Sequence, residues 1–249
     1  LSQANLYGNY NSGSLCAPAL SYANSRFWLI YTDVKTTGTF KDTLNYLISA
    51  PSIEGPWSEP TFLNASGFDP ALFHDDDGRH YLLNMLFDHR LDHPNFAGVV
   101  MQEYDLIHHR LVGNRQKIFQ GTKLGVAEGP QMLKKNGYYY LICAAGGTGF
   151  SHAATIARSR HLWGPYTSAP NTPLMTTKPH PQSPLQKCGH ISLVQVHPDE
   201  WYATFITARP LALQRGNCPL GRETGLTPIV WHDDWPYLAN GGEVPAVIN

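Results

Sequence analysis

A single glutamate among small residues is the part of the sequence best suited to acid–base chemistry. Glu128 lies in the run Gly-Val-Ala-Glu-Gly-Pro at residues 125–130. Glycine allows a close approach of backbone or ligand, and proline fixes the direction of the chain. A carboxyl group held there at the start of a strand would be fixed and partly desolvated, as a general acid must be. The alternative is an ordinary solvated glutamate at a strand end.

The segment after Glu128 has the pattern of a β-hairpin. Strand-like runs at 131–133 and 138–141 flank Asn136-Gly137, the dipeptide most typical of a tight hairpin turn. Comparable units, each a strand, a polar turn and an aromatic-rich strand, begin near residues 17, 69, 128 and 189. The sequence therefore contains an internal repeat, and the segment that begins at Glu128 is one copy of it.

The repeat predicts an all-β fold. Four-stranded units that recur at about 50 to 60 residues are typical of β-propeller blades. The 19 prolines and 22 glycines, and the absence of any long helical periodicity, favour the same class. The first strand of each propeller blade lines a central channel, so we expect Asp69, Glu128 and His190 to converge there with residues 17–19.

Composition narrows the class of protein. The 249 residues carry a formal net charge of -1 and only 15% charged residues, so nothing points to nucleic acid or an anionic membrane as partner. No apolar run reaches the roughly 18 residues that a membrane span needs, and the N-terminus lacks a signal-peptide pattern. The four cysteines show no CxxC spacing, which favours free thiols. The compartment stays open between cytoplasmic and secreted.

Several motifs together resemble glycoside hydrolase family 43. They are Gly-Phe-Asp-Pro-Ala-Leu-Phe-His-Asp at 67–75, Ala-Glu-Gly-Pro at 127–130, Lys-Cys-Gly-His at 187–190 and Cys-Pro-Leu-Gly-Arg-Glu at 218–223. The strand-like run at 28–34 fits as well. The branch that they match most closely comprises β-xylosidases that also cleave α-L-arabinofuranosides. The resemblance covers nearly the whole chain, and its motifs fall in the family's order.

The resemblance implies a five-bladed propeller, with about four blades in this sequence, and an inverting reaction. An acid protonates the leaving oxygen while a carboxylate base activates water on the opposite face, with the two carboxyls about 6.5 to 9.5 Å apart. The implied activity is that of an exo-β-1,4-xylosidase, with α-L-arabinofuranosidase activity, on oligosaccharides from xylan. The preference between xylose and arabinose stays open.

The resemblance also implies roles for particular residues. Glu128 matches the general acid, and Asp69 matches the aspartate that orients the acid and tunes its pKa. Four further residues match groups that contact the sugar: His190, Arg222, Thr148 and Phe87. No cofactor is implied, and a structural Ca²⁺ in the channel near His190 is left open.

The sequence departs from the family pattern in three places. It contains no Asn-Pro-Asp-Pro motif, which carries the family's general base, and residues 1–16 resemble only a linker between blades. It has no room for the C-terminal β-sandwich of this branch. Residues 16–19 read Cys-Ala-Pro-Ala where relatives often have Trp-Ala-Pro-Asp. We therefore expect residues 1–249 to form one propeller catalytic domain that is truncated at its N-terminus.

The truncation leaves a second interpretation open. A propeller fragment without the base would bind sugars but turn them over poorly. Its open blade edges would favour homo-oligomers, because unpaired strands recruit other strands.

Other chemically suggestive residues are better explained as structure. Residues 75–78 (Asp-Asp-Asp-Gly) are expected to form a hairpin turn rather than a calcium loop. Four histidines without metal-ligand spacing are assigned to surface loops: His89, His93, His108 and His109. Asp33 is interpreted as structural rather than as the missing base, because it follows an aromatic strand instead of opening one.

Overall fold

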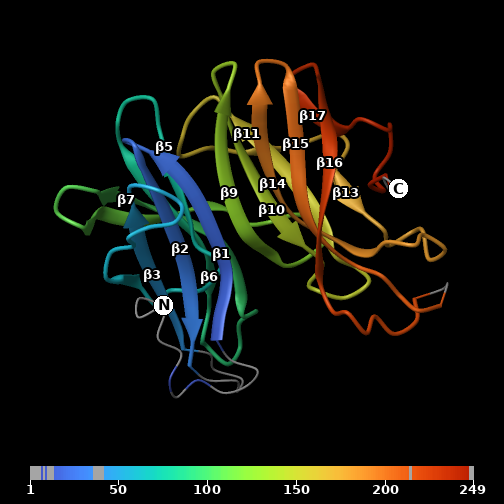
Figure 1. Ribbon diagram of the computed structural model, residues 1–249, viewed down its shortest axis with the longest axis horizontal. Coiled ribbons are helices and arrows are strands. Elements are labelled where there is room, and N and C mark those ends of the chain that lie inside the picture. Colours follow the sequence, from blue (N-terminus) through green and yellow to red (C-terminus); the bar gives the residue numbers. More distant parts are fainter. Residues whose placement is uncertain (1–6, 8, 10–13, 36–41, 213–214, 247–249) are drawn as a thin grey trace. The chain divides into compact units, whose positions relative to one another are not determined.

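The computed structural model describes residues 7, 9, 14–35, 42–212 and 215–246 (Figure 1). Within these ranges the regular structure consists of seventeen β-strands and no helix, which confirms the all-β class. The described part of the chain accordingly offers no helix of the length and apolarity needed to cross a bilayer.

The described strands form four antiparallel sheets in which strands that are consecutive in sequence pair with one another. The first sheet holds β1 (Ser14–Ala23), β2 (Arg26–Val34), β3 (Thr43–Ala50) and β4 (Thr61–Asn64). The second holds β5 (Ala71–His74), β6 (His80–Phe87), β7 (Phe96–Asp105) and β8 (Arg110–Phe119). Each sheet is thus a four-stranded meander, the form of a propeller blade.

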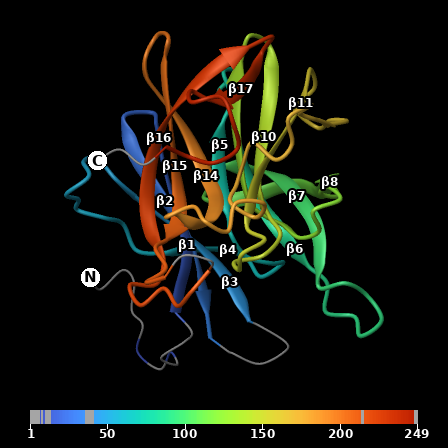
Figure 2. The ribbon, with the colours of Figure 1, turned by 90° about the vertical axis from the view of Figure 1, so that its right-hand side faces the viewer.

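The other two sheets repeat this pattern. The third holds β9 (Ala127–Lys135), β10 (Tyr138–Ala145), β11 (Ala153–Ser159) and β12 (Thr167–Ser168), with β13 (Met175–Thr176) also paired to β11. The fourth holds β14 (Gln186–His197), β15 (Glu200–Ala208), β16 (Glu223–His232) and β17 (Trp235–Leu238), and its strands lie side by side in Figure 2. The described residues therefore contain the four propeller blades that the sequence repeat predicts.

The chain divides into two compact units. Unit 1 comprises residues 1–120 and 128–132, and unit 2 comprises residues 121–127 and 133–249. Unit 1 contains the first two sheets and unit 2 the last two, except that residues 128–132 of β9 group with unit 1.

Unit 1 has its own apolar core, where β1 and β2 contact β5. One cluster of this core contains the buried side chains of Trp28, Ile30, Leu47, Leu63, Leu72, Leu82 and Tyr104. The indole Nε1 of Trp28 donates a hydrogen bond to the carbonyl oxygen of Ala23 at 3.1 Å. A buried indole that has a partner for its N–H contributes apolar area without an unsatisfied donor.

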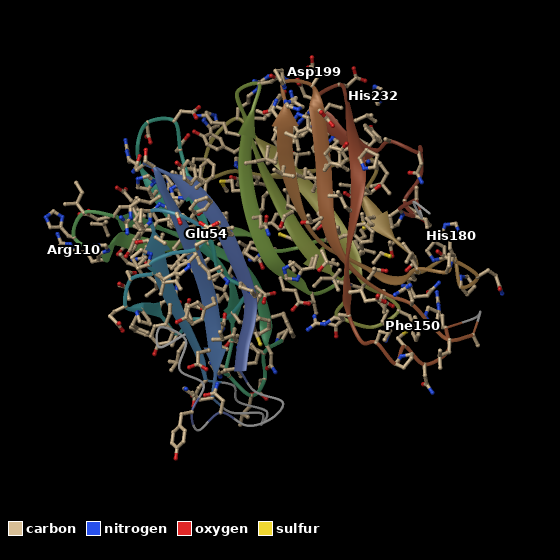
Figure 3. All side chains as sticks on the ribbon, viewed as in Figure 1. Glu54, Arg110, Phe150, His180, Asp199 and His232 are labelled. Carbon is tan, nitrogen blue, oxygen red and sulfur yellow. The ribbon has the colours of Figure 1, made fainter. Side chains whose placement is uncertain are left out.

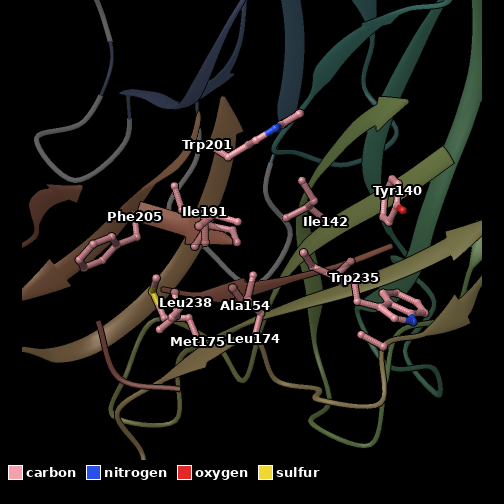
Figure 4. Packing of buried hydrophobic residues seen from close by; sticks show 14 of the residues in the cluster. Tyr140, Ile142, Ala154, Leu174, Met175, Ile191, Trp201, Phe205, Trp235 and Leu238 are labelled. Carbon is pink, nitrogen blue, oxygen red and sulfur yellow. The ribbon is translucent and has the colours of Figure 1, made fainter. Parts of the chain in front are cut away.

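Unit 2 also has its own core (Figure 4). It includes the buried side chains Tyr140, Ile142, Ala154, Leu174, Met175, Ile191, Trp201, Phe205, Trp235 and Leu238. The Tyr140 hydroxyl donates to the carbonyl oxygen of Asp234 at 2.6 Å, and the Asn136 amide donates to the Asp234 carboxylate at 2.7 Å. These bonds tie the third blade to the β16–β17 turn.

The hairpin after Glu128 forms as predicted. Asn136 and Gly137 have φ values of 50° and 72° between β9 and β10. Positive φ at both central residues is what a two-residue type I′ turn requires, and Asn-Gly meets it at little steric cost.

One left-handed residue recurs at or beside the first strand of each blade. Ala17, Asp69, Gly129 and His190 have φ values of 44°, 56°, 55° and 49°. The pairing register shifts around two of them, Ala17 in β1 and His190 in β14. This conformation is strained for the three that are not glycine, and backbone strain concentrates at functional sites. The shared positive φ also makes Gly129, and not Glu128, the residue of the third blade whose backbone conformation corresponds to that of Asp69.

Candidate active site

Two buried acidic residues lie next to one peptide group in unit 1. Asp69 and Glu128 are each only 7% exposed. The Gly129 backbone N–H donates a hydrogen bond to Asp69 Oδ2 at 2.9 Å, although 60 residues separate the two in sequence. Asp69 therefore fixes the backbone immediately after Glu128. The structure brings together the two residues that sequence analysis assigned to acid chemistry.

The end of strand β6 positions Asp69. The Met85 backbone N–H donates to the Phe68 carbonyl at 3.0 Å, and the Phe87 N–H donates to the Ser66 carbonyl at 2.9 Å. Between them, a Cβ on Gly67 would lie 1.7 Å from the Met85 carbonyl oxygen. Glycine is needed there because the two backbones approach too closely for a side chain.

Phe87 lies in an aromatic cluster behind this segment. Its ring centroid is 6.2 Å from that of Phe68 and 6.2 Å from that of Phe96. Phe87 is 7% exposed, so most of its surface contacts protein. It supports Phe68, the residue before Asp69, and offers little open surface of its own.

Unit 2 contains a separate cluster of basic side chains. His190 lies within the irregularly paired part of β14, and Arg222 is exposed directly before β16. Burial, and then the positive charge of Arg222, lower the pKa of His190 to about 4. His190 is therefore neutral at pH 7, and can donate or accept a hydrogen bond without carrying charge.

His152 belongs to the same cluster, and the sequence analysis did not identify it. It is 2% exposed, and its Nδ1 donates to the Lys187 carbonyl oxygen at 2.8 Å. Its pKa is lowered to about 4 by burial, against the raising effect of that hydrogen bond and with smaller lowering effects of His190 and Arg222. A Cβ on Gly189 would lie 2.7 Å from His152 Cδ2, so glycine at 189 makes room for this ring. The available signal was that glycine, directly before His190.

The His152 pKa predicts a loss of stability in acid. The folded-state pKa of about 4 lies below the ordinary 6.5, so the unfolded chain binds the proton more readily. The free energy of unfolding should then fall as pH drops from about 6.5 toward 4, by roughly 3 kcal/mol from this residue. His152→Asn retains a donor to Lys187 without titrating, so its unfolding free energy should depend less on pH. Urea unfolding of both proteins at pH 4 to 7.5 tests this, and identical slopes would contradict it.

The loop after β10 carries Thr148. Thr148 is exposed, whereas Phe150, labelled in Figure 3, is half-buried. Lys187 Nζ lies 4.8 Å and the Arg215 guanidinium carbon 5.4 Å from the Phe150 ring centroid. Cations at these distances from a ring are attracted to its face. These contacts support the loop at Phe150, while Thr148 faces solvent.

The residues interpreted as structural take the expected places. Gly78 N–H donates to the Asp75 carbonyl at 3.1 Å, which closes the turn at 75–78. All four cysteines are free thiols. The four histidines assigned to surface loops are exposed: His89, His93, His108 and His109.

Asp33 is paired rather than available. It is 7% exposed, forms an ion pair with Lys35 at 2.8 Å and accepts a hydrogen bond from the Asn9 amide at 2.6 Å. Because both oxygens of the Asp33 carboxylate have partners, the side chain stabilises the end of β2. The interpretation of Asp33 as structural agrees with these contacts.

The described residues contain no group of three or more His, Cys, Asp or Glu side chains placed to hold a metal ion. Near His190 the charged neighbour is the Arg222 guanidinium. Ca²⁺ prefers oxygen ligands and is repelled by such a cation, so these residues do not fit it well. A calcium ion near His190 stays an untested prediction.

Comparisons with known proteins agree on one family. Residues 2–236 match the model of "Glycosyl hydrolases family 43". The chain is 51% identical over 251 residues to a "Beta-xylosidase" of Bacillus subtilis (strain 168), covering 98% of this chain and 47% of that protein. It is 50% identical over 242 residues to a "Xylosidase/arabinosidase 43B" of Humicola insolens, covering 96% of this chain and 45% of that protein.

A solved structure has the same fold. The chain superposes on the crystal structure of a xylan beta-1,4-xylosidase from Bacillus halodurans C-125 with a TM-score of 0.94 and 49% identity. The match covers 98% of this chain and 47% of that one. The chain thus spans about half the length of the relatives that it matches.

Proposed function

The chain belongs to glycosyl hydrolases family 43, and from this we propose that it carries the catalytic propeller of an inverting exo-β-1,4-xylosidase that also accepts α-L-arabinofuranosides. The substrates are oligosaccharides derived from xylan. The relatives named as a beta-xylosidase and a xylosidase/arabinosidase support this substrate class.

One observation carries the proposal. Asp69 Oδ2 accepts the backbone N–H of Gly129, so the buried Asp69 is fixed next to the residue that directly follows the buried Glu128. Aspartate and glutamate are mostly exposed in folded proteins, so two buried carboxylates at one place are unusual. Their placement is consistent with a general acid, Glu128, and a residue that orients it, Asp69.

The proposed reaction uses Glu128 as proton donor. The carboxyl proton passes to the glycosidic oxygen as the bond from that oxygen to C1 of the sugar breaks. Water attacks C1 from the opposite face and gives its proton to a carboxylate base, so the configuration at C1 inverts. His190, Arg222, Thr148 and Phe87 contribute to sugar binding, the neutral His190 and the Arg222 guanidinium as hydrogen-bonding groups.

The general base of the proposed reaction is not assigned to a residue of this sequence. The sequence contains no Asn-Pro-Asp-Pro motif, which would carry the base aspartate. We propose that the complete catalytic fold is a five-bladed propeller, of which the described residues supply four blades.

Hydrolysis of nitrophenyl glycosides tests the substrate class. We expect nitrophenol release from the β-D-xyloside and the α-L-arabinofuranoside, with the β-D-glucoside as matched control, in buffer with and without azide. A hydroxymethyl group distinguishes the glucoside from the xyloside, and a subsite shaped for a pentose should exclude it. Equal rates on glucoside and xyloside would contradict the proposal.

Two substitutions separate the orienting role of Asp69 from a structural one. Asp69→Asn retains an oxygen that can accept the Gly129 N–H but removes the charge, whereas Asp69→Ala removes both. We expect Asp69→Asn to fold normally and to move the basic limb of the pH–rate profile to lower pH, because loss of a like charge makes ionisation of the acid easier. Asp69→Ala should also be less stable, by about 1–3 kcal/mol, since a buried N–H loses its partner. An unchanged pH profile in Asp69→Asn would contradict the orienting role.

A further inference from the structure

Unit 1 contains a cavity of about 460 Å³ that the proposed reaction does not use. Its lining includes side chains from the start of β2, the end of β3, the segment before β4 and the β7–β8 turn: Arg26, Trp28, Leu47, Ser49, Glu59 and His109. Cavities of roughly 300–1,000 Å³ are typical of small-molecule sites.

The cavity lies at the far end of the blades from Asp69. Strand β5 begins just after Asp69 and ends at His74. The His74 ring is 6.5 Å from the Trp28 ring, and Trp28 lines the cavity. His74 is itself held by Ser21, 2.9 Å from its Nε2. The cavity and the carboxylate pair are thus at opposite ends of one strand.

Hydrogen bonds fix the polar side of the cavity in place. The Ser58 N–H donates to the Ser49 carbonyl at 2.8 Å, and the Ser49 N–H donates to Ser58 Oγ at 3.0 Å. These bonds hold the segment that carries Glu59 against β3. The Arg26 guanidinium, which has five N–H donors, uses one of them to bond Ser49 Oγ at 3.1 Å.

The charged side chains that line the cavity indicate the chemical class of its ligand. Arg26 supplies donors, Glu59 supplies acceptors, and together they leave no large excess of either sign. A ligand with adjacent hydroxyl groups, each both donor and acceptor, matches such a pair better than an anion or a cation does. Trp28 and Leu47 close the inner end of the cavity but are only 5% and 2% exposed, so the contacts to a sugar would come mainly from the polar groups of Arg26 and Glu59.

We propose that this cavity is a second carbohydrate-binding site, which holds a neutral pyranose unit of a xylan chain away from the carboxylate pair. The choice of xylan rests on the proposed function. A site of this kind retains a polymeric substrate on the protein between cleavage events, which raises the local concentration of chain ends.

Nuclear magnetic resonance of the tryptophan indoles tests the proposal. The chain has six tryptophans, so Trp28 Nε1–H gives one of six indole signals in a ¹⁵N correlation spectrum. Xylohexaose is titrated into the chain with Glu128→Gln, which prevents turnover. The double variant Arg26→Gln/Glu59→Gln is compared with a matched control, Arg110→Gln/Glu54→Gln, whose altered residues are not among those that line the cavity. Glu59→Gln alone, at an exposed position, provides a second variant.

We expect a saturable shift of the Trp28 signal, weakened about tenfold or more in the cavity variants and unchanged in the control pair. No shift up to about 10 mM xylohexaose, equal binding by the cavity and control variants, or a response to glucuronate but not to xylohexaose would overturn the proposal. Failure of the proposed function can be distinguished from failure of the cavity proposal. A chain that releases no nitrophenol from xylosides even with azide, but shows the Trp28 shift, contradicts the proposed function and supports the cavity site. A chain that releases nitrophenol but shows no Trp28 shift supports the proposed function and contradicts the cavity site.

Discussion

Replacement of Glu128 by glutamine is expected to lower kcat/KM for xylobiose by about 10²- to 10⁴-fold. The leaving group of xylobiose is a sugar alkoxide, which departs slowly unless it is protonated. The glutamine amide would retain the size and hydrogen-bonding capacity of the Glu128 carboxyl but could not supply the proton. Glu128 is buried beside Gly129, whose N–H is held by Asp69, so the near-isosteric change should leave the fold intact.

The leaving group distinguishes acid catalysis from a general loss of activity. Dinitrophenolate departs without a proton, so Glu128→Gln should lose much less activity on dinitrophenyl xyloside than on xylobiose. Exposed Glu54 provides the matched control, and Glu54→Gln should retain the full activity on both substrates. An equal loss on both substrates, or full activity of Glu128→Gln on xylobiose, would show that Glu128 is not the proton donor.

The chain alone is expected to turn over xylosides slowly, and small anions should accelerate it. No residue matches the family's base, and loss of a general base typically lowers the rate by about 10²- to 10⁴-fold. Azide is a nucleophile that needs no deprotonation, so it can attack C1 in place of the activated water. We expect azide to raise the rate of nitrophenol release from nitrophenyl xyloside at least about tenfold, with a xylosyl azide as product.

The opposite result would identify a base within the chain. Rapid turnover without azide, and no effect of added azide, would mean that another carboxylate activates the water. Asp33 would be the first to test, by Asp33→Asn, although its ion pair with Lys35 at 2.8 Å argues for a structural role.

Local turn chemistry made the blades predictable from sequence. The hairpin at Asn136-Gly137 depends on positive φ at two adjacent residues, which this dipeptide adopts readily. The same repeated order of strand, polar turn and aromatic strand marked the other blades. The repeat also placed Asp69 and Glu128 near the first strand of their blades, where the structure has them.

Features that depend on distant residues could not be read from the sequence. His152 belongs to no motif, and its place depends on Lys187 and the space that Gly189 leaves. The equivalence of Asp69 with Gly129, rather than with Glu128, was overlooked, although each of the two precedes a proline in the sequence; the backbone φ values make it plain. The packing of the Phe87 ring against Phe68 and Phe96 likewise depends on residues that are distant in sequence.

The anomeric configuration of the first product is the most direct test of an inverting glycosidase. The chain is incubated with nitrophenyl β-D-xyloside and azide, and proton spectra are recorded from the first minutes. We expect α-configured xylosyl azide, with any free xylose also released as the α-anomer, because the nucleophile attacks the face opposite the leaving group. Products that form first in the β configuration would contradict the proposed reaction.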